Sequence, residues 1–163
     1  MAMVSLREID LEAVCRLNNQ FAAETSWLTE IGMRQLIGLS FYACGVVADP
    51  AAALDAMLIA LDQTAPYENE NFEFFRGRQE RFVYVDRVIT ASHAQGRGLG
   101  RQMYEDLFQR ARAAGQSIVG CEVNLAPPNP GSDAFHERLG FVEVGRARLK
   151  NEKLVRYLEF RLI

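Results

Sequence analysis

The feature that most constrains the fold is a glycine-rich segment, residues 95–101, between a predicted strand and a long predicted helix. Its sequence is Gln-Gly-Arg-Gly-Leu-Gly-Arg. Glycines let a backbone turn tightly and bring its N–H groups close to a ligand. The helix that begins there adds unpaired N–H donors and the positive end of its dipole, and Arg97 and Arg101 can add charge-assisted contacts. The segment therefore predicts a binding site for a pyrophosphate group.

Two well-known phosphate-binding motifs are excluded at this segment. A P-loop needs Gly-x4-Gly-Lys followed by Ser or Thr, and the chain has no such sequence. A dinucleotide fingerprint needs a third glycine at the position where Met103 stands. What remains is the pattern Gln-x-x-Gly-x-Gly, formed by Gln95, Gly98 and Gly100 after a strand.

Hydrophobic periodicity predicts a mixed α/β chain with the element order β-α-α-β-β-β-α-β-α-β-β. Strands are expected at residues 4–9, 42–48, 53–61, 81–90, 118–125, 141–149 and 155–162, with a turn at Asp49-Pro50. Helices are expected at residues 10–23 with Asp10 as N-cap, at 26–39, from Leu99 to a stop at Gly115, and at 132–139. Residues 62–80 show no clear period, and such segments in compact domains are often functional. We expect one domain over residues 1–163.

A second block follows the glycine-rich segment: Asn129, and then Ala-Phe-His-Glu-Arg-Leu-Gly-Phe at residues 134–141. Together the two blocks resemble the GNAT superfamily of acyl-CoA-dependent N-acetyltransferases. The hallmark of that superfamily is Arg/Gln-x-x-Gly-x-Gly/Ala, followed by Asn and Phe-Tyr-x-x-x-Gly-Phe. His136 stands where tyrosine is usual. The specific similarity covers residues 81–142, and the whole chain looks like a bacterial subgroup without an assigned substrate.

The resemblance implies a fold and a cofactor. The fold is a twisted, mixed, mostly antiparallel sheet of about six or seven strands flanked by about four helices, with a splayed strand pair at residues 82–90 and 118–125. The cofactor is acetyl-CoA. Its pantetheine arm would pair with the strand backbone at Val88, Ile89 and Thr90, and its pyrophosphate would be held by Gln95, Gly96, Arg97, Gly98, Leu99, Gly100 and Arg101. Asn129, Phe135 and His136 would lie near the sulfur.

Three side chains are candidate acids or bases, because an acceptor ammonium must lose a proton and the departing thiolate must gain one. His136 could protonate the thiolate, or it could be a solvated or structural helix residue. Asp86 lies mid-strand among apolar residues, so it either binds or deprotonates the amine or forms a structural ion pair with an arginine. Glu122 shares a strand face with Asn124, and it is either a second base or a carboxylate bonded to an arginine.

The acceptor is expected to be bound by the first half of the chain. Several residues of the irregular segment either shape its pocket or anchor a surface loop: Tyr67, Asn69, Asn71, Phe72 and Phe75. The resemblance adds Asn18, Asn19 and Trp27, although a tryptophan is more often core. His93 is expected to be an exposed turn residue without a role.

The predicted function is transfer of an acetyl group from acetyl-CoA to the primary amine of a small-molecule or peptide acceptor, by direct attack in a ternary complex. A free strand N–H could stabilise the oxyanion that forms as the amine attacks. The alternative is a non-catalytic acyl-CoA sensor or partner-binding module, which the histidine at position 136 leaves open. Homodimers are common among similar proteins, so a homodimer is possible.

Composition argues against several other classes of protein. The net charge of −3 and the pI of about 5.5 disfavour a dedicated nucleic-acid binder. Cys15, Cys44 and Cys121 are isolated among apolar residues, which fits buried thiols in a reducing cytoplasm. With only His93 and His136 and no metal-binding motif, we expect no metal. No segment has the composition of a signal peptide or a membrane span, so no membrane association is expected.

Overall fold

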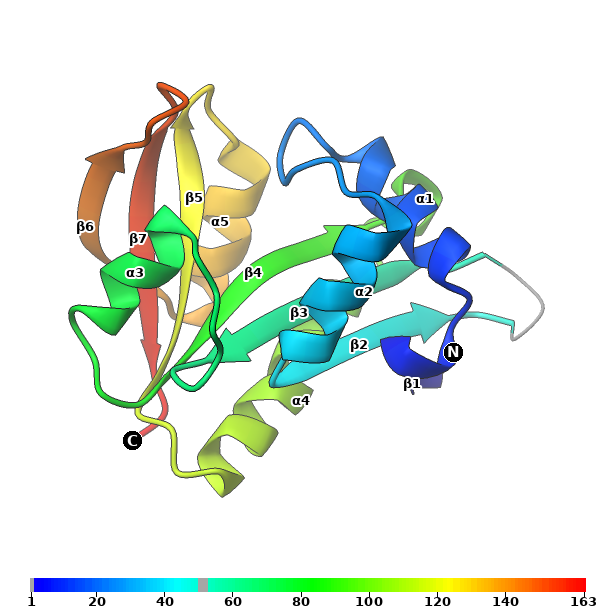
Figure 1. The fold of residues 1–163 in the computed structure, drawn as a ribbon, viewed down its shortest axis with the longest axis horizontal. Helices are drawn as coiled ribbons and strands as arrows, with labels where there is room; N and C mark the ends of the chain where they lie inside the picture. The colour runs from blue at the N-terminus through cyan, green and yellow to red at the C-terminus, as the bar shows by residue number, and fades with distance from the viewer. Residues whose placement is uncertain (1, 50–52) are drawn as a thin grey trace.

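The computed structural model describes residues 2–49 and 53–163, and its framework is one twisted sheet (Figure 1). Within these residues the strands are ordered β1-β2-β3-β4-β5-β7-β6. Their bounds are Ala2–Ser5 (β1), Tyr42–Val47 (β2), Ala56–Asp62 (β3), Phe82–Thr90 (β4), Ile118–Ala126 (β5), Val142–Arg148 (β6) and Leu154–Arg161 (β7). Neighbouring strands are antiparallel except β4 and β5, which are parallel. The predicted mixed, mostly antiparallel sheet is confirmed.

Helices cover both faces of this sheet. The α-helices of the described residues are α1 (Leu11–Gln20), α2 (Glu30–Leu39), α3 (Glu70–Arg76), α4 (Leu99–Ala113) and α5 (Pro130–Leu139). In Figure 1, α2 and α3 lie in front of the sheet and α4 lies behind it. α5 packs beside α4, where the rings of Tyr104 and Phe135 are 5.8 Å apart. None of the described helices combines the length and the apolar character that crossing a bilayer requires.

α3 lies within residues 62–80, for which the sequence predicted no regular structure. The helix is only seven residues long, and its N-cap Asn69 accepts the N–H groups of Asn71 and Phe72. It buries Phe72 and Phe75 against the sheet. A Cβ at Gly120 of β5 would lie 2.5 Å from the Phe75 ring, so this close packing requires glycine there. The fold therefore has one more helix than the four that were expected.

Residues 21–29 form a connecting segment rather than helix. α2 begins at Glu30, because the side chain of Thr29 accepts the N–H of Gly32 and caps the helix, so the predicted start at Ser26 was wrong. Trp27 in this segment is 63% exposed, and its interpretation as a core residue was wrong as well.

Smaller boundary differences occur near the N-terminus. The strand predicted at residues 4–9 is β1 followed by a 3-10 helix at Leu6–Glu8, and the third strand begins at Ala56. Pro50 of the predicted turn lies outside the described residues.

α4 carries the predicted apolar face, and this face anchors the glycine-rich segment to the sheet. Leu99, Met103, Leu107 and Ala111 are all at most 2% exposed. Gly115 follows the helix with φ of +75°, a left-handed conformation that glycine adopts easily, so the predicted stop is confirmed.

β4 and β5 splay apart, as predicted for residues 82–90 and 118–125. They pair only at Phe82–Ile118, Val83–Val119 and Tyr84–Gly120. β4 then continues to Thr90 and β5 to Ala126 without further pairing between them. Backbone groups of both strands therefore face a gap in the middle of the sheet, and unpaired strand N–H and C=O groups are available to a ligand there.

Candidate active site

The glycine-rich segment forms an open backbone cradle at the N-terminus of α4. Gly96 and Gly98 have φ of +80° and +74°, and Gly98 is the N-cap of the helix. A Cβ at either residue would meet no atom within 4 Å, so the space above the backbone is open. Left-handed glycines at the start of a fifteen-residue helix fit an anionic phosphate group.

Gly100 serves a different purpose from the other two glycines. A Cβ at this residue would lie 2.9 Å from Cζ of Phe135, so glycine here lets α5 approach α4 closely. Leu99 is buried beneath the loop, and the guanidinium of Arg101 lies 3.8 Å from Glu105 on the outer face of α4. Arg97 is exposed and donates to the carbonyl oxygen of His93. These residues surround the cradle, but they do not line the cavity beside it.

That cavity has a volume of about 560 Å³ and brings together eight residues of the predicted cofactor set: Val88, Ile89, Thr90, Gln95, Gly96, Asn129, Phe135 and His136. They come from β4, the glycine-rich segment and α5, and the gap between β4 and β5 is what allows them to meet. The cavity is also lined by residues that were not predicted: Phe21, Glu24, Thr25, Gly131, Ser132 and Arg138. Arg138 adds a cation on the α5 side of the cavity. We call this the cofactor cavity.

Two further cavities adjoin it. A connecting cavity of about 90 Å³ lies at the splay, where its walls include Val85, Cys121 and Tyr104. An acceptor cavity of about 230 Å³ lies beyond it, between α3, the segment 21–29 and the β6–β7 turn. Glu24 and Thr25 line all three cavities, although no pattern in the sequence points to either residue. The arrangement forms one path from the cradle through the splay to a polar pocket.

Glu122 lies where the connecting and acceptor cavities meet, and it lines both of them with Asn124, as their shared strand face predicted. One carboxylate oxygen, Oε2, accepts a hydrogen bond of 2.8 Å from the Tyr84 hydroxyl. The pKa of Glu122 is raised to about 8, because burial and the nearby Asp86 raise it by more than the Tyr84 hydrogen bond lowers it. A carboxyl group with such a pKa can take up a proton near neutral pH.

Asp86 lies close to Glu122 but has both oxygens occupied. Oδ1 accepts a hydrogen bond of 2.6 Å from Tyr67, and Oδ2 lies 2.7 Å from Nε of Arg87. The side chains of Asp86 and Arg87 are 4% and 5% exposed. Arg87 also donates to Asn18 Oδ1 at 2.7 Å and to Ser26 Oγ at 3.2 Å. The pair thus joins β4 to Tyr67 on one wall of the acceptor cavity and to Ser26 on another.

His136 is buried in the wall between the cofactor and connecting cavities, with both ring nitrogens engaged. Nδ1 lies 2.8 Å from the backbone oxygen of Ser132, which can only accept, so we assign the hydrogen to Nδ1. Nε2 then accepts a hydrogen bond from the Tyr104 hydroxyl, also 2.8 Å away. Burial is the main cause that lowers the pKa of His136. The sequence did not reveal Tyr104, because it falls on the buried face of α4 like a core residue.

The predicted acceptor residues are only partly brought together. Tyr67, Asn69 and Asn71 line the acceptor cavity, whereas Phe72 and Phe75 are core residues beneath it. Asn18 and Asn19 hold the segment 21–29 through the backbone of Ser26 and Leu28. Trp27 lines none of the three cavities. Ser26, Asn151 and Lys153 line the pocket without having been predicted.

Of the remaining candidate residues, His93, Cys15 and Cys44 line none of the three cavities, whereas Cys121 lies in the wall of the connecting cavity. His93 has an exposed side chain that contacts Asp55 at 2.8 Å. Cys15, Cys44 and Cys121 are free and buried, and burial is the main cause that raises the pKa of each thiol. Across residues 2–49 and 53–163, no three His, Cys, Asp or Glu side chains are grouped in a way that could hold a metal ion.

Comparison with known proteins gives a family match over the same part of the chain. The model of the Acetyltransferase (GNAT) family matches residues 54–141. An L-methionine sulfoximine/L-methionine sulfone acetyltransferase of Pseudomonas aeruginosa is 35% identical over 88 residues, which is 54% of this chain and 47% of that protein. A phosphinothricin N-acetyltransferase of Streptomyces coelicolor is 36% identical over 70 residues, 43% of this chain and 40% of that protein. The similarity thus spans about half the length of these relatives.

Solved structures match the fold over the whole chain. The ribosomal-protein-S18-alanine N-acetyltransferase of Escherichia coli has a TM-score of 0.73 at 17% identity, covering 99% of this chain and 93% of that one. An aminoglycoside 6'-N-acetyltransferase complexed with coenzyme A has a TM-score of 0.72 at 11% identity, covering 100% and 98%. At these identities the likeness concerns the fold alone.

Proposed function

Because the chain belongs to the GNAT acetyltransferase family, we propose that it transfers the acetyl group of acetyl-CoA to a primary amine of a small-molecule acceptor. The transfer proceeds by direct attack in a ternary complex, and residues 1–163 act as one acetyltransferase domain. One observation carries the proposal: the connecting cavity at the splay of β4 and β5 shares wall residues with both the cofactor cavity and the acceptor cavity, and Glu122 lines the connecting and acceptor cavities.

The cofactor cavity and the adjoining cradle offer the groups that coenzyme A needs. Backbone N–H groups of residues 95–100 and the guanidinium groups of Arg97 and Arg101 hold the pyrophosphate, and the open space at Gly96 and Gly98 admits it. The edge of β4 at Val88, Ile89 and Thr90 that faces the gap, opposite its pairing with β3, binds the pantetheine arm. Bound acetyl-CoA supplies an activated thioester, and strand N–H groups at the gap stabilise negative charge on its carbonyl oxygen.

Glu122 is the proposed base. Its carboxylate takes a proton from the acceptor ammonium, and Tyr84 keeps the group in place through Oε2. The alternative base, Asp86, has both oxygens occupied by Tyr67 and Arg87, so we assign it a positioning role.

The hydrogen-bonded pair of Tyr104 and His136 is the proposed acid. In the neutral pair the shared proton lies on the Tyr104 hydroxyl, so the pair rather than His136 alone protonates the sulfur. The acceptor nitrogen loses a second proton as the tetrahedral adduct collapses, and this proton replaces the one that the Tyr104–His136 pair gives to sulfur. Glu122 then releases its own proton to solvent, so each turnover releases one proton.

A small polar molecule is the acceptor that suits the pocket best. The acceptor cavity has a volume of about 230 Å³ and is lined by four asparagines, Asn69, Asn71, Asn124 and Asn151. Its volume lies below the range of about 300–1,000 Å³ that is usual for small-molecule sites, which favours a small acceptor. The two relatives named above acetylate methionine sulfoximine or sulfone and phosphinothricin according to their names, which supports a small-molecule amine over a peptide.

A thiol-release assay with acetyl-CoA and a panel of small primary amines tests this function. We expect turnover with at least one amine, and a large loss in a Glu122→Gln variant that still binds CoA. Tight CoA binding without turnover on any amine would contradict the enzyme and support the acyl-CoA sensor instead. Absence of CoA binding in calorimetry would contradict both.

We further propose that the protein works in a reducing cytoplasm, which its three buried free thiols support. The homodimer that the family resemblance allows can be checked by sedimentation equilibrium.

A further inference from the structure

The acceptor cavity has two ends with different charges. Glu122 lines both this cavity and the connecting cavity, so it lies at the end nearer the splay. Lys153 lines the acceptor cavity but not the other two, and so do Asn69 and Asn151. A molecule that fills the pocket therefore meets the Glu122 carboxyl group at the splay, and at the other end the Lys153 ammonium group, where Glu70 also lines the wall.

Arg87, the other cation that lines the acceptor cavity, already has its charge matched. Its Nε contacts Asp86 at 2.7 Å, and its remaining donors are directed to Asn18 and Ser26. The residue is 6% exposed. Asp86 and Arg87 therefore contribute little net charge to the pocket, and neither is free to bind an acceptor group.

Lys153 differs from Arg87 in having no carboxylate partner. It lies in the turn between β6 and β7, and its Nζ donates a hydrogen bond of 3.2 Å to the backbone oxygen of Ala23. No carboxylate of the described ranges lies within ion-pair distance of this ammonium. A neutral carbonyl is a weaker partner than an anion, because hydrogen bonds between two charged groups are the stronger ones. An anionic ligand can therefore replace Ala23.

The strand register sets the distance between the two ends. Glu122 of β5 is paired with Tyr157 of β7, and Lys153 lies four residues before Tyr157 along the chain. Four residues of extended strand span about 13 Å. The glutamate and lysine side chains cover part of this distance. Because strand side chains stand roughly perpendicular to the sheet, we infer that the gap between the two charged groups is wider than the one between the amine and the carboxylate of a simple α-amino acid.

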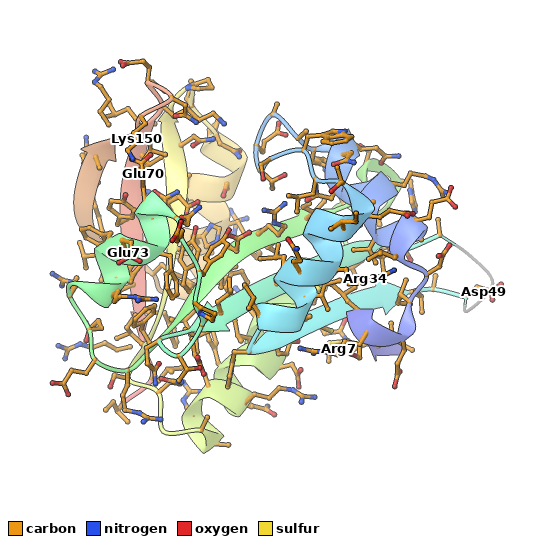
Figure 2. All side chains as sticks on the ribbon, viewed as in Figure 1. Arg7, Arg34, Asp49, Glu70, Glu73 and Lys150 are labelled. Atoms are coloured by element: carbon orange, nitrogen blue, oxygen red, sulfur yellow. The ribbon has the colours of Figure 1, made fainter. Side chains whose placement is uncertain are left out.

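Glu70 also lines the acceptor cavity, and at the Lys153 end it is the carboxylate that could oppose an anionic ligand. Its two oxygens each lie 3.3 Å from the backbone N of Lys150 and accept from it. Figure 2 shows Glu70 of α3 and Lys150 of the β6–β7 turn side by side. Lys150 and Lys153 are the only lysines in a chain whose other basic residues are arginine or histidine. Lys150 does not line the cavity, so it offers a matched control.

We propose that Lys153 binds an anionic group of the acceptor, carried several bonds from the reacting amine, and so selects acceptors with such a remote anionic group, for example amino acids with an acidic side chain. This inference rests on the proposed acetyltransferase function and names the acceptor class for the same site. Lys153 is then a specificity-determining residue. It contacts the acceptor but neither acetyl-CoA nor the transferred acetyl group.

Pairs of acceptors that differ only in this group test the proposal. Initial rates are measured with L-glutamate against L-glutamine, and with L-2-aminoadipate against its side-chain amide. The proteins are wild type, Lys153→Gln, Lys153→Arg and the control Lys150→Gln. Lys153 is half-buried at the surface, so thermal melting is expected to show that each variant folds.

Wild type is expected to prefer the acidic member of each pair. Lys153→Gln should lower kcat/KM for that member by roughly tenfold or more, the loss of one charge-assisted hydrogen bond, through KM rather than kcat. The neutral member should change little, Lys153→Arg should recover part of the loss, and Lys150→Gln should behave as wild type. Two results would each overturn the role of Lys153 and leave the acetyltransferase function standing. One is that wild type turns over both acceptors of a pair at equal rates, and the other is that Lys153→Gln loses the same fraction of kcat/KM for both. Turnover of no amine at all would overturn the acetyltransferase function beneath it.

Discussion

Replacing Asp86 with asparagine tests how the acceptor cavity is held in shape. The substitution keeps the size of the side chain but removes its charge. The amide oxygen of the new side chain can still accept one hydrogen bond, whereas Arg87 loses the carboxylate that neutralises it at 2.7 Å. Tyr67 loses a charged acceptor at 2.6 Å. The change thus leaves a nearly buried guanidinium without its counter-charge.

The expected loss of stability follows from the burial of this pair. Removing one partner of a buried ion pair typically costs about 3–5 kcal/mol. Arg87 keeps its bonds to Asn18 and Ser26, so we expect the lower end, about 3 kcal/mol. In a chain of this length each kcal/mol corresponds to about 2–4 °C, so the melting temperature should fall by roughly 6–12 °C. A double variant that also carries Arg87→Met removes both charges and should recover most of the loss.

Thermal unfolding followed by circular dichroism measures the stability, and steady-state kinetics measure the consequence for the site. Asp86 and Arg87 line the acceptor and connecting cavities but not the cofactor cavity. In Asp86→Asn the KM for the acceptor should therefore rise while the KM for acetyl-CoA stays within about twofold, a change below about 0.5 kcal/mol. A melting temperature within about 2 °C of wild type would mean that the Asp86 charge contributes less than about 1 kcal/mol to the free energy of unfolding, which contradicts the expected loss.

Three further predictions concern the rest of the site. With an acceptor whose amine has a low pKa, kcat/KM of wild type should rise with pH through about 8, because Glu122 is protonated and inactive as a base below that pKa. In Glu122→Gln the rate should fall by about 10²-fold or more, and kcat/KM should no longer rise with pH through about 8. A pH profile identical to that of wild type would exclude Glu122 as the base. Tyr104→Phe leaves Nε2 of His136 without a donor in a buried site, so urea unfolding should show a loss of about 1–3 kcal/mol, and equal stability would contradict the assigned tautomer. Gly98→Val places a branched side chain on a backbone with φ of +74° and fills the open cradle, so calorimetry should show at least tenfold weaker CoA binding. The control is Gly38→Ala on α2, where a Cβ would have no atom within 4 Å, and this variant should bind CoA like wild type.

The second half of the fold could be predicted from the sequence because its signals are local. The spacing of Leu99, Met103 and Leu107 defines a helix face, and Gly115 and Gly140 mark helix ends through their left-handed backbone. α3 could not be predicted in the same way. Seven residues are too few for a clear period, and its stability comes from packing Phe72 and Phe75 against distant strands.

The site was predictable where a backbone motif specifies it and not where side chains meet across the chain. The cradle at residues 95–100 follows from glycine chemistry alone. By contrast, Arg87 and Asn18 are 69 residues apart in sequence, and the Tyr104–His136 hydrogen bond spans 32 residues. Glu24 lies in a segment without periodicity, where only the folded chain shows that it lines all three cavities.

A crystal structure of the protein with coenzyme A bound tests the central claim most directly. The account predicts the pyrophosphate on the backbone N–H groups of residues 95–100 and the pantetheine arm along Val88, Ile89 and Thr90. It places the sulfur in the connecting cavity, between Glu122 and the Tyr104–His136 pair. A sulfur atom outside the splay of β4 and β5, or a pyrophosphate bound away from Gly96 and Gly98, would contradict the account.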